Sequence, residues 1–358
     1  YFRALWQSAS NNLWISKLDQ VTGKFEAGST YQLATGLAPV DADNANGPEW
    51  VYSSSGVVSI IYTVPDATYG YRLKVAKEVN AGGAANADGW TLYYVPNAEG
   101  GRCALGTYPE NTGPSRILYQ KLTDGVVKVY WRNLYYNEQG VETELSAEAS
   151  QAHFSFDGTQ IALAQVPGPN DPLCSESIVR NPMIYDIGTG SKTCVKQTAI
   201  KAGFPWILDL DEDGDKETML FTLETEHRTI EVYQKQTDGS WLSIKRIQAQ
   251  APERFISSPE PFKGNDDKWY VVYATLSVAA SDFYTDPTAT GSIWIASLSD
   301  DSLNDKVTPA APAKRSEPEA LILPNGKTGI YYTYSLYDEE LVEYTEQGTL
   351  RMTRIILP

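Results

Sequence analysis

Apolar and polar residues alternate along almost the whole chain, and long segments with helical periodicity are absent. The alternating segments are rich in β-branched and aromatic residues, and clusters of Gly, Asn, Asp and Pro separate them. Examples are VVSIIYT, RILYQKL, VVKVYWRNLYY, TIEVYQKQ, WYVVYAT, SIWIASL and TGIYYTYS. This pattern is typical of antiparallel strands joined by turns. The sequence therefore predicts an all-β protein.

Internal similarity divides most of the chain into six repeats, each opening with a hairpin of two apolar strands. The repeats begin near Gly47, Arg102, Gln151, Gly203, Ser258 and Glu317. A period of about 40–60 residues indicates a propeller or a solenoid. The N-terminal segment RALWQSASNNLWISKLDQVTGKFEAG has the pattern of later strands but no first strand of its own. We therefore expect the N-terminal strands to complete the sheet that the C-terminal repeat begins.

One repeat, AHFSFDGTQIALAQ, resembles the blade motif of TolB-like six-bladed propellers, in which an aromatic-Ser-x-Asp-Gly turn precedes an Ile-Ala strand. The resemblance implies an all-β, six-bladed β-propeller, a single domain over residues 1–358 that is closed by its N- and C-terminal strands. Five blades, as in the related arabinanase-like glycosidases, or seven blades are the alternatives. TolB-like propellers serve as binding scaffolds, peptidase gates, lactonases and polysaccharide lyases, so the resemblance implies the fold and no single function.

A Pro-Glu pair stands before the first apolar strand in three of the repeats. The glutamates are Glu49, Glu260 and Glu319, and each lies thirteen residues before a tyrosine of the following strand. In a propeller the first strand of each blade lines the central channel, and a position at its start recurs around one channel mouth. We therefore expect the three carboxylates to face one axial funnel that binds the ligand.

The same position in the other repeats carries different residues. It is His153 in the third repeat, Pro205 in the fourth, and either Arg102 or Thr107 in the second. Three roles for the glutamates and His153 stay open. They can hydrogen-bond backbone N–H groups of neighbouring blades, ligate a divalent cation such as Ca²⁺, Mn²⁺ or Zn²⁺, or act as an acid/base pair on a glycan or ester.

The segment DLDEDGDKE, residues 209–217, resembles the calcium loops of integrin-type propeller repeats. The resemblance implies a structural Ca²⁺ ion on a blade hairpin, and the alternative is a solvated acidic turn. Closely spaced carboxylates supply hard oxygen ligands, and a glycine at position 214 permits the tight turn. The expected metal ligands are Asp209, Asp211, Asp213, Asp215 and Glu217.

The three cysteines differ in their surroundings. Cys174 and Cys194 flank an alternating segment that is typical of a hairpin turning near residues 188–191. Both ends of a hairpin can lie within bridging distance, so we expect a Cys174–Cys194 disulfide, with two buried thiols as the alternative. A disulfide would suit an oxidising compartment. Cys103 is then left as a small core residue.

Composition narrows the partners and the location. The chain has 358 residues with a formal net charge of −16, and such an acidic surface argues against a nucleic-acid partner. No apolar run approaches the roughly 18 residues of a membrane span. The first residues, YFRALWQSAS, lack the features of a signal peptide, so an exported protein would be seen here in its mature form. We expect a secreted or periplasmic protein.

These observations predict a propeller that binds an extracellular ligand, a glycan or a cell-envelope partner, at its axial funnel. One alternative is a polysaccharide lyase or glycoside hydrolase that uses a Glu/His funnel site with a divalent cation. Another is a protein-interaction scaffold. The sequence contains no Walker loop, GxSxG elbow or HExxH motif, and it does not decide whether the protein is an enzyme.

Overall fold

The computed structural model describes most of the chain, and the statements below concern these residues. They are residues 3–40, 47–52, 56–80, 84–108, 115–134, 142–145, 148–167, 180–195, 202–210, 218–223, 228–250, 252–283, 285–301, 303–338, 343–355 and 357. The chain divides into two compact units. The first comprises Tyr1–Asp19 and Phe25–Ala199, and the second comprises Gln20–Lys24 and Ile200–Pro358.

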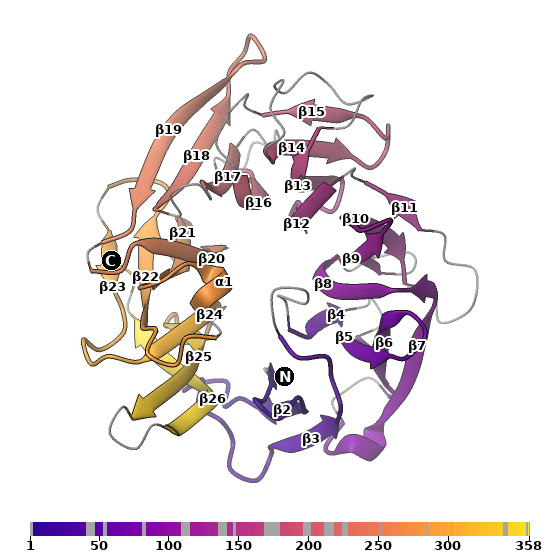
Figure 1. The fold of residues 1–358 in the computed structure, drawn as a ribbon. Helices are drawn as coiled ribbons and strands as arrows, with labels where there is room; N and C mark the ends of the chain where they lie inside the picture. Colours follow the sequence, from indigo (N-terminus) through magenta and orange to yellow (C-terminus); the bar gives the residue numbers. More distant parts are fainter. Residues whose placement is uncertain are drawn as a thin grey trace. The chain divides into compact units, whose positions relative to one another are not determined.

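The first unit contains four antiparallel sheets, each built from strands that are consecutive in the chain (Figure 1). A 3₁₀ helix, η1 (Ala87–Gly89), precedes β7. The strands are β1 (Arg3–Gln7), β2 (Leu13–Lys17) and β3 (Tyr31–Ala34); β4 (Glu49–Tyr52), β5 (Val58–Asp66), β6 (Gly70–Glu78) and β7 (Trp90–Glu99); β8 (Gly101–Tyr108), β9 (Arg116–Thr123), β10 (Val126–Asn133) and β11 (Thr143–Glu144); β12 (Glu148–Phe154), β13 (Gln160–Val166), β14 (Asn181–Asp186) and β15 (Lys192–Cys194).

The second unit contains three further sheets of the same meander type (Figure 1). A short helix, α1 (Ala280–Phe283), lies between β21 and β22. The strands are β16 (Ala202–Leu208), β17 (Thr218–Leu223), β18 (Thr229–Lys235) and β19 (Trp241–Gln248); β20 (Phe255–Lys263), β21 (Trp269–Leu276), β22 (Gly291–Ser297) and β23 (Asn304–Lys306); β24 (Lys314–Ile322), β25 (Thr328–Asp338) and β26 (Glu343–Ile355).

The described strands form seven sheets, so the fold is a seven-bladed β-propeller and the prediction of six blades is wrong. The all-β class is confirmed, and each of the six predicted repeats begins at or near the first strand of a sheet. The seventh sheet is the N-terminal one. The prediction of a single domain over residues 1–358 stays a prediction.

The expected closure by shared strands is also wrong, because the two ends of the chain each form a sheet of their own. β1, β2 and β3 pair with one another, and β24, β25 and β26 do the same. Trp6 of β1 lies opposite Trp14 of β2, and their rings stack with centroids 6.5 Å apart. This cross-strand aromatic pair stabilises the N-terminal sheet without strands from the C-terminal repeat.

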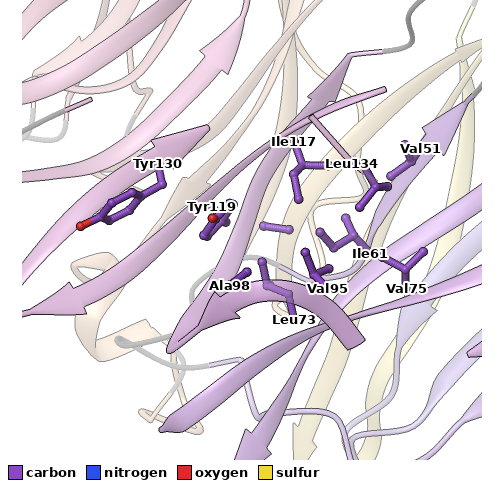
Figure 2. Close-up of a cluster of buried hydrophobic side chains, with 11 residues drawn as sticks. Val51, Ile61, Leu73, Val75, Val95, Ala98, Ile117, Tyr119, Tyr130 and Leu134 are labelled. Carbon is purple, nitrogen blue, oxygen red and sulfur yellow. The ribbon is translucent and has the colours of Figure 1, made fainter. Parts of the chain in front are cut away.

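Apolar clusters between successive sheets hold each unit together. Figure 2 shows one of them, between the β4–β7 sheet and the β8–β11 sheet. Ile61 and Leu73 from the first sheet meet Ile117 and Tyr119 from the second, and all four are fully buried. Equivalent clusters lie between the other neighbouring sheets of each unit. This repeated burial is the main favourable contribution to folding.

The turn that carries the TolB-like motif has a clear physical basis. The hydroxyl of Ser155 donates to Asp157 Oδ1 at 2.7 Å, and the same carboxylate accepts the backbone N–H of Thr159. Gly158 has a φ of +69°, and a Cβ atom there would lie 2.3 Å from the ring of Tyr108. The position therefore requires glycine for both its backbone conformation and its packing.

The segment Gln20–Lys24 connects β2 with β3 but belongs to the second unit. Two hydrogen bonds to its backbone carbonyls link it to that unit. Tyr331 donates its hydroxyl to Gly23 O at 2.6 Å, and Asn325 donates its side-chain amide to Val21 O at 2.5 Å. Among the described residues no helix is long and apolar enough to cross a membrane.

Candidate functional site

The three glutamates of the repeated Pro-Glu pair occupy the same position in three first hairpins. Glu49 begins β4, Glu260 lies in β20 and Glu319 lies in β24. Their cross-strand partners are, in this order, Ile61, Val272 and Tyr331. A tyrosine follows each partner directly, so the constant interval in the sequence corresponds to a constant hairpin register.

In the second unit the proline of this pair lies in a β-bulge. In β20 the paired residues are Ser257 with Ala274 and Glu260 with Val272, so two residues of the first strand oppose a single residue, Tyr273. β24 has the same slip between Ser316 and Glu319, opposite Tyr332. A bulge interrupts the hydrogen-bond ladder, and proline is tolerated there because it has no N–H to donate.

The residue before the bulge proline has a left-handed backbone in all three sheets of the second unit. In the β16 sheet this proline is Pro205. The φ angles are 46° at Phe204, 45° at Ser258 and 53° at Glu317. A residue with a Cβ atom seldom adopts this conformation, and each instance costs on the order of 1–3 kcal/mol. The second unit therefore carries the same backbone strain at one equivalent point of all three of its sheets.

The β16 sheet shows that the bulge does not require a glutamate. Its slip lies between Gly203 and Trp206, so Pro205 takes the bulge position. Trp206 then stands where Glu260 and Glu319 stand in the next two sheets, and the sequence-based alignment of Pro205 with the glutamates is off by one residue. The proline bulge thus occurs in all three sheets of the second unit, whereas a glutamate follows the proline in only two of them.

Glu319 is the most unusual carboxyl of this set. Its side chain is exposed to solvent, yet the protein around it removes much of the water that would solvate its charge. This desolvation, together with a smaller contribution from the Glu317 carboxylate, raises the pKa of Glu319 to about 7. Glu317 itself accepts a hydrogen bond from the Thr333 hydroxyl at 3.1 Å. Glu319 therefore exchanges its proton near neutral pH.

Glu260 lies on the neighbouring first strand of the same unit. β20 contacts β24, and Glu260 is half-buried at the position equivalent to Glu319. The second unit thus presents two carboxyl groups at corresponding points of adjacent sheets. Each of these carboxyl groups can accept a hydrogen bond from an amine or hydroxyl group or bind a cation.

The first unit contains the other two predicted funnel residues. Glu49 is half-buried at the start of β4, and His153 is half-buried in β12, opposite Ala162. The bulge in β12 falls between Ala149 and Gln151, so Gln151 rather than His153 follows it, as Glu260 follows the bulge in β20. His153 lies two residues nearer the hairpin turn. That Glu49 and His153 bind the same ligand as Glu260 and Glu319 stays a prediction.

The two candidates of the second repeat have structural partners. Arg102 is buried in β8, with its guanidinium 5.6 Å from the centroid of the Tyr71 ring. Thr107 donates its hydroxyl to the carbonyl of Trp50 at 2.5 Å. Thr107 thereby ties β8 to the strand that begins with Glu49.

Most of the predicted calcium loop and one predicted disulfide cysteine lie outside the described residues. Of the loop only Asp209, which is half-buried after β16, and Leu210 are described. Cys194 ends β15, whereas Cys174 lies outside the described part of the chain. The described residues contain no group of three or more His, Cys, Asp or Glu side chains that could hold a metal ion. The calcium site and the disulfide stay predictions.

Sequence reasoning missed Glu317 as a member of this set. Glu317 matters because its carboxylate lies beside Glu319 and raises the pKa of that group. The available signal was the residue before proline, which is biased away from the right-handed helical region. A glutamate at that position, two residues before a second glutamate, marks a pair of carboxyl groups on one bulge.

Comparisons with known proteins add support at the level of the fold. No family model matches this chain, and no curated protein matches it. Among solved structures the chain is similar to dihydro-heme d1 dehydrogenase NirN in complex with DHE, with 11% identity, a TM-score of 0.50, and coverage of 98% of this chain and 74% of that chain.

Two further similar structures have lower TM-scores. TolB from Acinetobacter baumannii has 12% identity and a TM-score of 0.47 over 87% of this chain and 64% of that chain, so this chain spans less than two thirds of it. The β-propeller domain of the Trilobed protease from Pyrococcus furiosus has 9% identity and a TM-score of 0.43 over 84% of this chain and 82% of that chain. At these identities the TolB-like resemblance concerns the fold alone, and the site must be judged from its own residues.

The strain at Ser258 predicts an unusual effect of glycine. Ser258→Gly should raise the free energy of unfolding by about 0.5–1 kcal/mol, because glycine adopts a positive φ without a Cβ clash. Ser257→Gly, at the preceding buried position with an ordinary φ, should instead lower it by a similar amount. Urea unfolding of both variants measures the two changes. A loss of stability in Ser258→Gly as large as that in Ser257→Gly would argue against strain at the bulge.

The raised pKa of Glu319 predicts a pH-dependent stability. Between the ordinary glutamate pKa and about 7 the folded protein binds more protons than the unfolded chain, so stability falls as pH rises through this window. Glu319→Gln removes the titration. Its melting temperature should be close to that of the parent at pH 4, below the window, and should exceed it by about 2 °C at pH 8. Equal melting temperatures of the parent and Glu319→Gln at pH 8 would contradict the assignment.

Proposed function

We propose that this protein is a binding propeller whose second unit contacts an extracellular ligand, a glycan or a cell-envelope partner, through Glu260 and Glu319. The observation that supports this most is Glu319 itself. It is a solvent-exposed carboxyl group with a pKa of about 7 on a strained proline bulge. Strained backbone and perturbed pKa values both concentrate at functional sites.

The charge around Glu319 indicates which ligands the site accepts. When Glu319 is ionised it stands two residues from Glu317, and the protein carries a net charge of −16. Such a surface attracts cations, amines and hydroxyl groups and repels polyanions that no cation bridges. A neutral or amino-bearing glycan therefore fits the site better than a polyuronate. Glu49 and His153 stay proposed ligand contacts of the first unit.

An enzyme of the polysaccharide lyase or glycoside hydrolase type is the second candidate. A general acid works best when its pKa lies near the working pH, and the pKa of about 7 at Glu319 meets that condition. Glu260, on the adjacent first strand, would then supply the second carboxyl group. Release of reducing sugar ends or of unsaturated uronates would support this candidate over a binding protein. A protein-interaction scaffold that binds no small ligand is the third candidate function.

A glycan array tests the binding proposal directly. The parent should bind neutral or amino-bearing glycans, and Glu319→Gln and Glu260→Gln should each weaken that binding on the order of tenfold, whereas Glu26→Gln should not. Binding of amino-bearing glycans should also increase between pH 6 and pH 8, because Glu319 gains its charge in this interval. An array without any bound glycan, or equal binding by all variants, would contradict the proposal. A co-purifying protein in that case would favour the scaffold.

We also propose that residues 209–217 bind one structural calcium ion, on the basis of their spacing of carboxylates and glycine. Removal of calcium by a chelator should lower the melting temperature without unfolding the protein, because the apolar clusters between the sheets remain. Addition of calcium should restore it. Differential scanning calorimetry of the parent and of Asp211→Ala measures the effect. A parent that melts at the same temperature with and without chelator would refute the site.

The proposed location, secreted or periplasmic, depends on a Cys174–Cys194 disulfide. If that bond is present, thiol titration of the denatured, unreduced protein should find a single free sulfhydryl, that of Cys103. Cys103→Ser should then leave none. Three free thiols in the parent would exclude the bond and remove the main argument for an oxidising compartment.

A further inference from the structure

The outer edge of the β4–β7 sheet is formed by β7, whose first half is apolar. Among the described strands β7 is the last in the order β4-β5-β6-β7, so one of its edges has no described neighbour in this sheet. Leu92, Tyr93 and Tyr94 are 45%, 37% and 46% exposed, and residues 91–95 contain no charged residue and no proline. Pro96 and a bulge opposite Leu73 end this apolar stretch. Long apolar edges of this kind are ready to pair with another strand.

The corresponding edge of the β16–β19 sheet is protected. β19 also exposes two apolar side chains, Leu242 and Ile244, but Lys245 and Arg246 follow them directly. Charged residues, lysine above all, are a common protection of edge strands against added strands. The apolar stretch of β7 is therefore the stronger candidate for a docking edge. Lys245, whose ammonium pairs with Asp301 at 2.8 Å, offers a charge-reversal control on β19.

Two cationic side chains of β6, the strand paired with β7, lie over a tyrosine ring of β7. Lys74 of β6 lies directly opposite Tyr94, and its ammonium is 4.8 Å from the centroid of the Tyr94 ring. The guanidinium of Arg72, two residues earlier in β6, is 4.3 Å from the same centroid. Both charges therefore lie above the edge strand rather than above the middle of the sheet.

The two cations differ in how far they are neutralised. Arg72 has carboxylates nearby, at 3.5 Å in Glu99 and 3.9 Å in Asp66. Lys74 makes no ion pair with any described residue, and its contact is the ring of Tyr94. Lys74 is thus a cation at an open strand edge, in a protein whose net charge is −16.

These contacts favour a peptide over a sugar as the occupant. Arg72 and Lys74 already lie over the Tyr94 ring, which leaves less of that ring for stacking against a sugar. The edge of β7 instead offers backbone groups for a new strand, flanked by tyrosine, arginine and leucine side chains. An added strand would run about 4.8 Å from β7, within reach of both cations.

We propose that the β7 edge binds an extended acidic segment of a partner protein by strand addition. In this complex, backbone hydrogen bonds to β7 supply affinity, and carboxylates at alternate positions of the segment pair with Lys74 and Arg72. The inference does not depend on the glutamates of the second unit, so either proposal can fail without the other.

Two capped synthetic heptapeptides test this proposal, one alternating threonine or valine with glutamate and a matched one with lysine in place of glutamate. Fluorescence anisotropy should show that the full-length protein binds the glutamate peptide and not the lysine peptide, and that added salt weakens binding. Lys74→Glu should weaken binding on the order of tenfold, and the milder Lys74→Gln should weaken it less. Lys245→Glu, the same charge reversal on the β19 edge, should have no effect.

Three results would overturn the proposal. The first is no binding of either peptide, and the second is equal binding of both. The third is unchanged binding of the glutamate peptide to Lys74→Glu when circular dichroism shows that this variant is folded. Light scattering separates a further case, because a parent that dimerises unless Leu92 is replaced by lysine uses this edge for a second copy and not for an acidic partner.

Discussion

A proline set opposite a buried aromatic residue interrupts the first β-ladder in every sheet of the second unit, and the candidate site depends on this interruption. Pro205 lies opposite Phe221, and Pro259 lies opposite Tyr273. Pro318 lies opposite Tyr332 in the last sheet. The extra residue alters which side chains share a face of the strand. Each proline is buried, and the residue after it reaches solvent fully or in part.

The bulge and the charge at Glu319 both oppose folding, and the packing around them compensates. The residue before Pro318 has a left-handed backbone, and its carboxylate lies beside a second one that the protein desolvates. The cluster between the β20–β23 and β24–β26 sheets buries Val272, Ile330 and Tyr332 next to these strands. Strain that persists in such surroundings is held there by the rest of the fold. This strain is the reason that we propose a functional role for the bulge.

Much of this arrangement could be predicted from the sequence because it depends on local pattern. Alternating apolar residues predicted the sheets, and the constant Glu-to-Tyr interval predicted that Glu49, Glu260 and Glu319 share one hairpin register. The search for repeats in the sequence missed the seventh sheet, because β1, β2 and β3 are only four or five residues long and have no Pro-Glu hairpin. A sheet without the repeated motif is not detected by a search for that motif.

The presence of a bulge is easier to predict than the residue at which it falls. His153 was aligned with the glutamates, but the slip between Ala149 and Gln151 moves that position to Gln151. Likewise the slip between Gly203 and Trp206 gives the position of the glutamates to Trp206 rather than Pro205. One extra residue in a strand moves every following side chain, and only the observed ladder shows where that residue lies. The raised pKa of Glu319 was also beyond the sequence, because it results mainly from desolvation in the folded protein.

The pKa of Glu319 is the quantity on which this account depends most. Carbon-13 NMR of the Glu319 carboxyl group, titrated between pH 4 and pH 9 and assigned with Glu319→Gln, measures it directly. The account predicts a midpoint of about 7 in the parent and a lower midpoint in Glu317→Gln, where one source of repulsion is removed. A midpoint in the ordinary range of glutamate, about 4.3, in the parent would contradict it.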